Sequence, residues 1–179
     1  MHVDSSRLHV RLAAISTSML LAACTSEDPV RSGPSGQSRP AAQARPAGDD
    51  GRVTRHTDGD TLRVDGVKVR LIGVDTPEVS AGSECFGTAA SARTAELLPI
   101  GEPVRLVYDV DRHDRYGRVL AYVYRLRDGV FVNAELVEGG YATVLTVPPN
   151  VAHADAFIAL QREARAAQRG VWGACQPVP

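Results

Sequence analysis

The sequence predicts an α+β protein built on a five-stranded β-barrel of the OB type, with about three helices. Three observations favour this fold. Turn signals at Asp58-Gly59 and Asp65-Gly66 divide residues 52–75 into three short segments in which apolar and polar residues alternate. A helical pattern follows the third segment. Two more strands and two more helical patterns then complete the chain, and no internal repeat interrupts this order.

The expected strands are short, and each ends at a turn or a break. The third strand closes with Asp75-Thr76-Pro77-Glu78, where Pro77 favours an extended Thr76 and blocks a helix. An apolar extended segment at 141–147 follows the barrel strands. We expect the five barrel strands at residues 52–57, 61–64, 67–75, 104–108 and 119–124.

The expected helices combine a 3.6-residue pattern with terminating residues. Pro99 stops the first helix, and Gly170 stops the third. Asn133 is a candidate N-cap of the second helix. We expect these helices at residues 87–98, 132–137 and about 150–168.

The beginning of the chain predicts export. Arg7 and Arg11 precede a largely apolar run at 12–23, which is too short to span a bilayer and is typical of a signal peptide. The run ends in Leu21-Ala22-Ala23-Cys24, which resembles the lipobox of bacterial lipoproteins, where the peptide is cut before a cysteine that carries lipid. We therefore expect an extracytoplasmic protein anchored to the cell membrane through Cys24. The alternative is an ordinary signal peptide and a secreted protein.

These features divide the chain into three parts. Residues 1–23 are the expected signal peptide. Residues 24–50 contain the lipid-bearing cysteine and a segment rich in Ser, Gly, Pro, Ala and Gln, which has too few apolar residues to fold and is expected to be a disordered tether. Residues 51–179 are the expected globular domain.

Composition and charge exclude several kinds of site. The formal net charge is −1, so the protein does not coat nucleic acid through a general positive field. The three cysteines form no C-x-x-C pair, and the five histidines show no zinc-ligand spacing. Any site for nucleic acid must therefore be local.

Three carboxylates and two arginines, placed on separate turns, predict such a site. Asp60 lies in the first turn, Arg70, Asp75 and Glu78 lie on or after the third strand, and Arg118 precedes the fifth strand. Carboxylates and carbonyl groups are the ligands that Ca²⁺ prefers, and arginine presents a planar fork to phosphate oxygens. We therefore predict a calcium-dependent phosphodiesterase site.

From about residue 53 to residue 172 the chain resembles the staphylococcal nuclease (thermonuclease) family. Each motif alone is common, but the five together in this order are specific. They are Asp58-Gly59-Asp60-Thr61, Arg70-Leu71-Ile72-Gly73-Val74-Asp75-Thr76-Pro77-Glu78, Asp114-Arg115-Tyr116-Gly117-Arg118, Val132-Asn133-Ala134-Glu135-Leu136-Val137 and Gly170-Val171-Trp172.

The resemblance implies endonucleolytic cleavage of DNA and/or RNA, leaving 3′-phosphate ends, with single strands favoured and a monomeric enzyme. It implies Asp60, Asp75 and the Thr76 carbonyl as ligands of Ca²⁺. Glu78 would orient or deprotonate the attacking water.

The same resemblance assigns the cationic residues. Arg70 and Arg118 would bind the phosphate and stabilise the transition state. Tyr116 and Arg115 would contact the phosphate or the sugar. Tyrosines that line the nucleotide pocket in the family are absent near Leu145-Thr146-Val147, and the loop after Glu78 is short.

Cys85 and Cys175 flank the expected core of a chain routed outside the cytoplasm, where disulfides persist. We expect a disulfide between them, with two free thiols as the alternative. Two functional alternatives also remain. One is a catalytically inactive OB-fold module that binds nucleic acid or protein, and the other is a module with a structural calcium ion.

Overall fold

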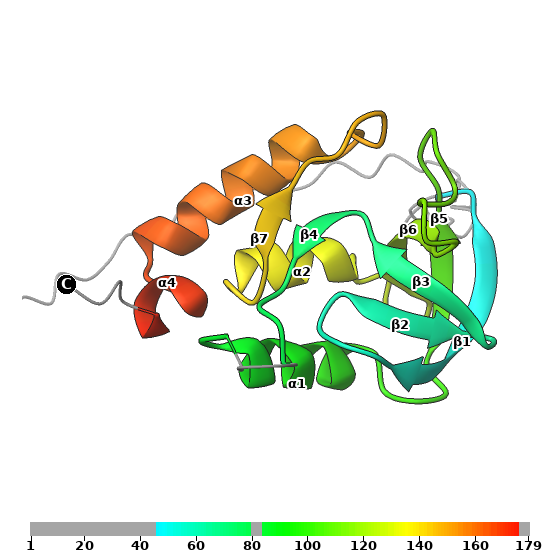
Figure 1. Ribbon diagram of the computed structural model, residues 1–179, viewed down its shortest axis with the longest axis horizontal. Helices are drawn as coiled ribbons and strands as arrows, with labels where there is room; N and C mark the ends of the chain where they lie inside the picture. Colours follow the sequence, from blue (N-terminus) through cyan, green and yellow to red (C-terminus); the bar gives the residue numbers. More distant parts are fainter. Residues whose placement is uncertain (1–45, 80–83, 176–179) are drawn as a thin grey trace, which may run out of the picture. The chain divides into compact units, whose positions relative to one another are not determined.

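The computed structural model describes residues 46–79 and 84–175. In this part of the chain five strands form a closed barrel, as the sequence predicts (Figure 1). Their order around the barrel is β1-β2-β3-β6-β5. A separate pair, β4 and β7, forms a two-stranded sheet. The strands are β1 Asp49–His56, β2 Thr61–Val64, β3 Val67–Leu71, β4 Gly73–Asp75, β5 Pro103–Val107, β6 Val119–Arg125 and β7 Thr143–Leu145.

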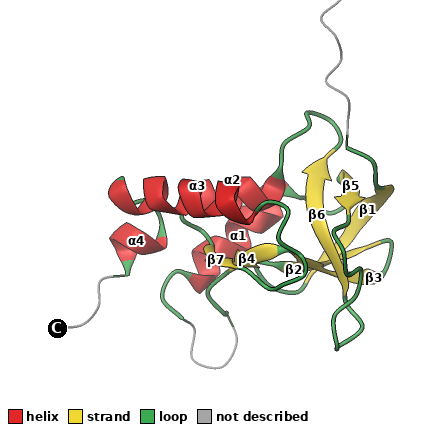
Figure 2. Cartoon of the chain, turned by 90° about the horizontal axis from the view of Figure 1, so that it is seen from above, coloured by secondary structure: helices red, strands yellow, loops and turns green. Residues whose placement is uncertain are grey.

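Four helices accompany the strands. In two views at right angles, the barrel lies at one end of the domain and α3 and α4 at the other, with the β4–β7 pair between them (Figures 1 and 2). Helix α2 packs against both α3 and β6, so it joins the helical layer to the barrel. The helices are α1 Gly87–Leu97, α2 Val132–Glu138, α3 Ala154–Ala166 and α4 Val171–Ala174.

Most barrel strands pair in antiparallel fashion with their neighbours, but β3 and β6 run parallel. In that pair Arg70 stands opposite Leu120. Val69 and Leu71 on either side of Arg70 are 0% and 1% exposed, so the alternation of the strand directs Arg70 out of the barrel. The parallel pairing therefore places Arg70 beside the first residues of β6. Arg118 directly precedes this strand, so the two arginines lie close to the same strand end.

One hydrophobic core fills the barrel and continues beneath the helices. Burying each large aliphatic side chain contributes about 1.5–3 kcal/mol, so this core supplies most of the driving force for folding. Its fully buried members include Val53, Leu62, Val69, Leu71, Val104, Ala121, Val123, Val132, Leu136 and Phe157.

Strand β1 begins at Asp49, three residues before the expected start of the first strand at residue 52. Asp49 and Asp50 already pair with β5. The guanidinium of Arg105 donates to Asp50 through Nε at 2.6 Å and Nη2 at 2.8 Å. Two acidic residues after a polar stretch carry no strand signal of their own, and their partners lie far along the chain. The expected signal peptide, Cys24 and most of the expected tether lie outside the described residues.

The expected third strand at 67–75 is two strands. The chain leaves the barrel at Ile72, and Gly73 has a φ of 79°, a conformation that favours glycine. Strand β4 then pairs with β7, which accounts for the apolar extended segment at 141–147. The apolar residues on both sides of Gly73 resemble one continuous strand, so this break was not predicted from the sequence.

Asn133 is not the N-cap of α2, which begins after Phe131. It is completely buried and joins two other elements. Its Oδ1 accepts from the backbone N–H of Val123 at 2.9 Å, and its Nδ2 donates to the carbonyl of Ile72 at 2.8 Å. The side chain thus satisfies two backbone groups where the chain leaves the barrel.

The structure confirms the disulfide between Cys85 and Cys175, whose Cα atoms are 5.9 Å apart. It links the start of α1 to the end of α4, a short helix that the sequence had not predicted. The Pro148-Pro149 peptide bond is cis. Helices α1 and α2 end within one residue of the expected positions, whereas α3 begins at Ala154, about four residues later than expected, and ends two residues earlier, at Ala166.

Candidate functional site

The loop between β1 and β2 holds Asp60 in a buried position. Asp60 is only 6% exposed. Its Oδ2 accepts from Thr76 through the backbone N–H at 3.1 Å and the hydroxyl at 3.3 Å. The loop approaches Thr76 closely, because a Cβ on Gly59 would lie 2.6 Å from the Thr76 hydroxyl oxygen. The Thr94 hydroxyl of α1 fixes the loop from the other side by donating to the Gly59 carbonyl at 2.6 Å.

Arg70 lies between two of the predicted carboxylates. Its Nη1 is 2.8 Å from Asp60 Oδ2, and its Nη2 is 2.9 Å from Asp75 Oδ1. Nη1 also donates to the carbonyl of Val74 at 2.8 Å. These contacts hold the guanidinium in one orientation, and its side chain is 12% exposed. Asp75 is much more open, with 53% of its side chain exposed.

Burial raises the pKa of Asp60 to about 6. The positive charge of Arg70 and the hydrogen bond from Thr76 oppose this rise, and the nearby Asp58 adds to it. The raised pKa means that the ionised carboxylate lacks part of the stabilisation it would have in water. A carboxylate in this condition favours a further cation.

The loop before β6 is organised by Asp114. Its Oδ1 accepts from the backbone N–H groups of Tyr116 and Arg118, both at 2.9 Å. Its Oδ2 accepts from Arg118 Nε at 2.6 Å. Burial raises the pKa of Asp114, but the hydrogen bonds from Arg118 and Tyr116 outweigh it and hold this pKa below its ordinary value. An ionised Asp114 therefore orients Arg118.

Tyr116 stands at the surface between two arginines. It is 68% exposed. The guanidinium carbons of Arg115 and Arg118 lie 4.8 Å and 5.5 Å from its ring centroid. Arg115 Nη2 also donates to the Tyr116 hydroxyl at 2.6 Å. The ring therefore separates two cationic groups and keeps both near the pocket.

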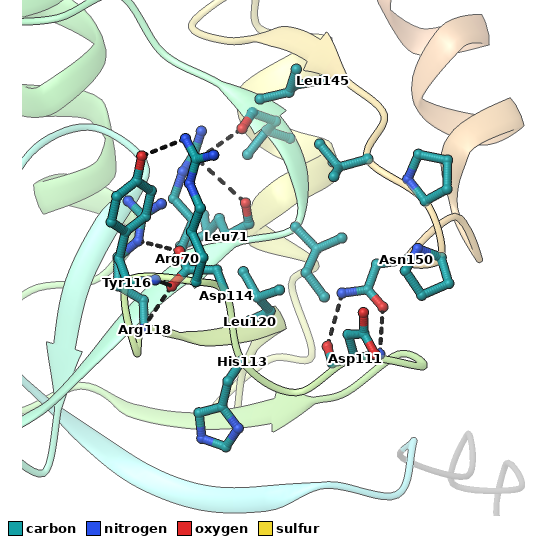
Figure 3. Close-up of a pocket in the computed structure, with 17 residues that line it drawn as sticks. Arg70, Leu71, Asp111, His113, Asp114, Tyr116, Arg118, Leu120, Leu145 and Asn150 are labelled. Atoms are coloured by element: carbon teal, nitrogen blue, oxygen red, sulfur yellow. Dashed lines mark hydrogen bonds and ion pairs between the residues drawn. The ribbon is translucent and has the colours of Figure 1, made fainter.

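A pocket of about 540 Å³ brings the cationic residues together. Arg70, Arg118 and Tyr116 gather at one end of it, and Asp111 and Asn150 lie at the other (Figure 3). Aliphatic residues from β7 and the segment after it form a wall, which comprises Leu145, Val147, Pro148 and Pro149. The pocket thus combines a cationic end with an apolar side.

Asp75 and Thr76 line a second, smaller depression of about 310 Å³. Glu78 lines neither cavity, and its side chain is exposed. Within residues 46–79 and 84–175 the Glu78 carboxylate has no hydrogen bond or ion pair, whereas its backbone N–H donates to Glu84. The structure therefore joins Asp60, Arg70, Asp75 and Thr76 directly, and leaves Glu78 beside them.

The oxygen donors fit a hard cation. In the described part of the chain, no group of three or more His, Cys, Asp or Glu residues clusters as a complete metal site. Asp60 and Asp75 instead flank the same guanidinium, and Thr76 lies in contact with Asp60. Two carboxylates and a carbonyl are the donor types that Ca²⁺ takes, with water completing the shell.

Two polar residues of the site were missed from the sequence. Asp114 belongs to one of the family motifs but was assigned no role, although an Asp two residues before a Tyr-Gly turn is a recognisable hydrogen-bonding signal. The sequence indicates Asn150 only as the start of the expected third helix. Its amide exchanges hydrogen bonds of 2.8 Å with the backbone N–H and carbonyl of Asp111, which ties the two sides of the pocket together. No local pattern indicates that pairing.

Comparison with known proteins shows which proteins this chain resembles. The family model described as staphylococcal nuclease homologue matches residues 68–174. The match begins after Asp60, so the placement of Asp60 rests on the fold itself.

Three relatives illustrate the similarity. A thermonuclease of Staphylococcus intermedius is 40% identical over 127 residues, which are 67% of this chain and 74% of that protein. Endonuclease YncB of Bacillus subtilis (strain 168) is 40% identical over 129 residues, covering 67% of this chain and 60% of YncB. An uncharacterized endonuclease of Escherichia coli is 36% identical over 134 residues, covering 72% of this chain and 80% of that protein.

Proposed function

The chain belongs to the staphylococcal nuclease family, and we propose that it is a calcium-dependent nuclease. It hydrolyses phosphodiester bonds of DNA and/or RNA and leaves 3′-phosphate ends. The observation that carries this proposal is the convergence of Arg70 and Arg118 in one pocket, next to the carboxylates of Asp60 and Asp75. Cleavage of a phosphodiester requires positive charge at the phosphate, because negative charge develops on the phosphate oxygens while water attacks. The arginines supply this charge directly, and the carboxylates would supply it by holding a cation.

The arginines bind the scissile phosphate. Both line the pocket from different elements, Arg70 from β3 and Arg118 from the loop before β6. Two guanidinium groups can each donate to phosphate oxygens, and a guanidinium held by carboxylates and carbonyls needs little reorganisation as charge develops. Asp114 keeps Arg118 in place through its 2.6 Å hydrogen bond.

Asp60, Asp75 and the Thr76 carbonyl are the groups that would hold the calcium ion. When bound, the ion neutralises charge on the phosphate and lowers the pKa of coordinated water. The raised pKa of Asp60 supports this assignment, because its ionised form is insufficiently stabilised by Arg70 alone.

Glu78 acts on the attacking water. Its carboxylate is exposed and, in the described part of the chain, has no protein partner that would compete for that water. Glu78 follows Thr76 by only two residues, so it stands beside the calcium donors. It orients the water and accepts its proton.

The rest of the pocket contacts the nucleotide. Tyr116 and Arg115 lie at the cationic end, where they contact the phosphate or the sugar. The aliphatic wall at Leu145 and Val147 faces the space left for a base. An unpaired base can enter such a pocket, whereas a base inside a duplex must first unstack, so single strands are favoured. The enzyme acts as a monomer.

The enzyme works outside the cytoplasm, anchored to the cell membrane through lipid on Cys24. This proposal is based on the apolar run at 12–23 and the Leu-Ala-Ala-Cys motif. In the described residues there is no helix of the length and apolarity that crossing a membrane requires.

The function is tested with the full-length chain and a labelled single-stranded DNA and RNA of the same sequence, with calcium or with chelator. We expect calcium-dependent cleavage and product ends that a 3′-phosphatase converts to 3′-hydroxyls. Glu78→Gln should reduce kcat by roughly a hundredfold or more, in the range typical of a lost general base. Glu138→Gln is the matched control, because Glu138 is an exposed glutamate at the end of α2. Equal rates in Glu78→Gln and the parent would refute the mechanism.

The alternative is an inactive OB-fold module that binds nucleic acid or protein. Such a module has no need of Asp60, Arg70, Asp75 and Arg118 in contact with one another or in one pocket. The same assay separates the two functions. Retention of DNA or RNA without cleavage, with and without calcium, would favour the module.

A further inference from the structure

The backbone of Glu78 is held at both of its polar groups by Glu84. The Glu78 N–H donates to Glu84 Oε2 at 3.0 Å, and the Glu78 carbonyl accepts from the Glu84 N–H at 3.0 Å. The carbonyl of Glu84 in turn accepts from the N–H of Gly87 at 3.0 Å. Glu84 therefore fixes where the Glu78 main chain lies, and this is the element from which the Glu78 carboxylate projects.

The same turn is packed tightly against Glu78. A Cβ on Gly87 would lie 2.5 Å from the Glu78 carbonyl oxygen, so only glycine allows α1 to begin there. Within residues 46–79 and 84–175 the Glu78 carboxylate itself has no partner. The position of the Glu78 carboxylate is consequently determined by the Glu78 backbone, and thus by the contacts that keep Glu84 in place.

Glu84 is followed directly by Cys85, which is bonded to Cys175 at the end of α4. Helix α4 is held in place by backbone hydrogen bonds. Its Val171 N–H donates to the Gly140 carbonyl at 2.9 Å, and the Cys175 N–H donates to the Val171 carbonyl at 3.0 Å. The disulfide therefore connects the turn at Glu84 to a helix fixed on the main body of the domain.

The disulfide and the proposed calcium donors share one depression. Both cysteines line it, together with Asp75, Thr76 and Glu84. A displacement of the Cys85 turn would therefore occur beside the donors and would pull on Glu78 through its two hydrogen bonds. Cys85 is exposed, so reductants have access to the bond.

We propose that the Cys85–Cys175 disulfide and Glu84 form a positioning device for Glu78. Glu84 clamps the Glu78 backbone, and the disulfide holds Glu84. Breaking the disulfide releases the clamp and lowers kcat without weakening substrate binding, since Arg70 and Arg118 lie on other elements. This inference rests on the proposed function, because it requires Glu78 to act on the attacking water.

The first experiment compares the full-length oxidised protein with Cys85→Ser, Cys175→Ser and the double variant. Assays are run in saturating calcium, at a temperature where the fluorescence of Trp172, the only tryptophan, shows every variant folded. We expect the three variants to lose the same factor in kcat, about tenfold to a hundredfold, as misplacement of a catalytic group by about 1 Å does. KM should change less than threefold. A kcat within twofold of the parent would overturn the proposal.

The second experiment separates positioning from ligation. Glu84→Ala removes the acceptor for the Glu78 N–H, whereas Glu84→Gln keeps a carbonyl oxygen at that place. We expect Glu84→Ala to lose kcat as the cysteine variants do, and Glu84→Gln to recover most of the loss. If both variants fail equally and calcium titration shows weaker binding, Glu84 is a calcium ligand and the proposed clamp is wrong.

The third experiment tests whether the disulfide acts through Glu78. The cysteine substitutions are repeated in a Glu78→Gln background, where they should change the residual rate less than twofold. A purely structural role of the disulfide would lower the rate by the same factor in the parent and in the Glu78→Gln background.

If the oxidised parent shows no calcium-dependent cleavage at all, the proposed function fails. If the parent is active and the variants are equally active, only the positioning device fails.

Discussion

Asp60→Asn should make the calcium-free protein more stable while abolishing calcium-dependent cleavage. The pKa of Asp60 rises from 3.8 to about 6 in the folded protein, because burial outweighs the attraction of Arg70. Asparagine has nearly the same shape as the protonated acid, and its amide oxygen can still accept from Thr76. Arg70 keeps Asp75 and the Val74 carbonyl as partners.

The magnitude follows from linkage between protonation and folding. The folded state holds the Asp60 proton more tightly than the unfolded state, so the contribution of this group to stability is fully present below pH 3.8 and is lost as pH rises towards 6. A shift of about two pKa units corresponds to about 3 kcal/mol. The asparagine variant does not lose this contribution. The free energy of unfolding of the variant should therefore exceed that of the parent by up to about 3 kcal/mol above pH 6, and by much less near pH 4.

Urea denaturation at several pH values, in the presence of chelator, measures this difference. Groups other than Asp60 titrate in both proteins, so their effect on stability cancels when the free energy of unfolding of the parent is subtracted from that of the variant. Asp75→Asn is the control, because it removes the other carboxylate on Arg70 at an exposed position and should change stability by less than about 1 kcal/mol. A variant less stable than the parent at pH 7.5, or a difference independent of pH, would contradict the buried environment of Asp60.

Three further predictions follow from the same contacts. Calcium affinity should fall by roughly tenfold per pH unit below about pH 6, because protons compete for Asp60, and calorimetric titration checks this. Asn133→Ala should destabilise the protein by roughly 2–5 kcal/mol, because the Val123 N–H and the Ile72 carbonyl lose their partner, and a loss below about 1 kcal/mol in urea would count against it. Asp114→Ala should lower kcat/KM by about tenfold through disorder of Arg118, whereas Asp114→Asn, which retains an acceptor, should lose less, as initial-rate kinetics will show.

The sequence predicts the barrel well because its signals are local. Asp65 and Gly66 both have positive φ in the hairpin between β2 and β3, which the Asp-Gly pair indicates directly. The alternation at Val69, Arg70 and Leu71 likewise gives the direction of Arg70. The break at Gly73 and the pairing of β4 with β7 were missed, since nothing within the segment distinguishes a strand that leaves the barrel.

The sequence singled out several of the residues that the structure brings together, but not the contacts between them. The combination of charged residues at Asp60, Arg70, Asp75 and Arg118 indicated a site, because such residues rarely occur together without a functional reason. The ion pairs that join Arg70 to both carboxylates depend on the barrel closing, so no short pattern contains them. Asn133 shows the same limit. Its residue type suggested a cap, and only the neighbouring elements reveal that it satisfies two buried backbone groups.

The parallel pairing of β3 with β6 also fixes the spacing between Arg70 and Arg118, the two arginines that we propose bind phosphate. Arg70 stands opposite Leu120 in that pair, and Arg118 immediately precedes β6. A slip of one residue would turn Arg70 into the barrel, so the ladder permits only one spacing. The intervening helix and loops can therefore lengthen, shorten or acquire a disulfide without changing the distance between the two arginines. In this fold the loops around the proposed site can diversify while the spacing of the arginine pair remains constant.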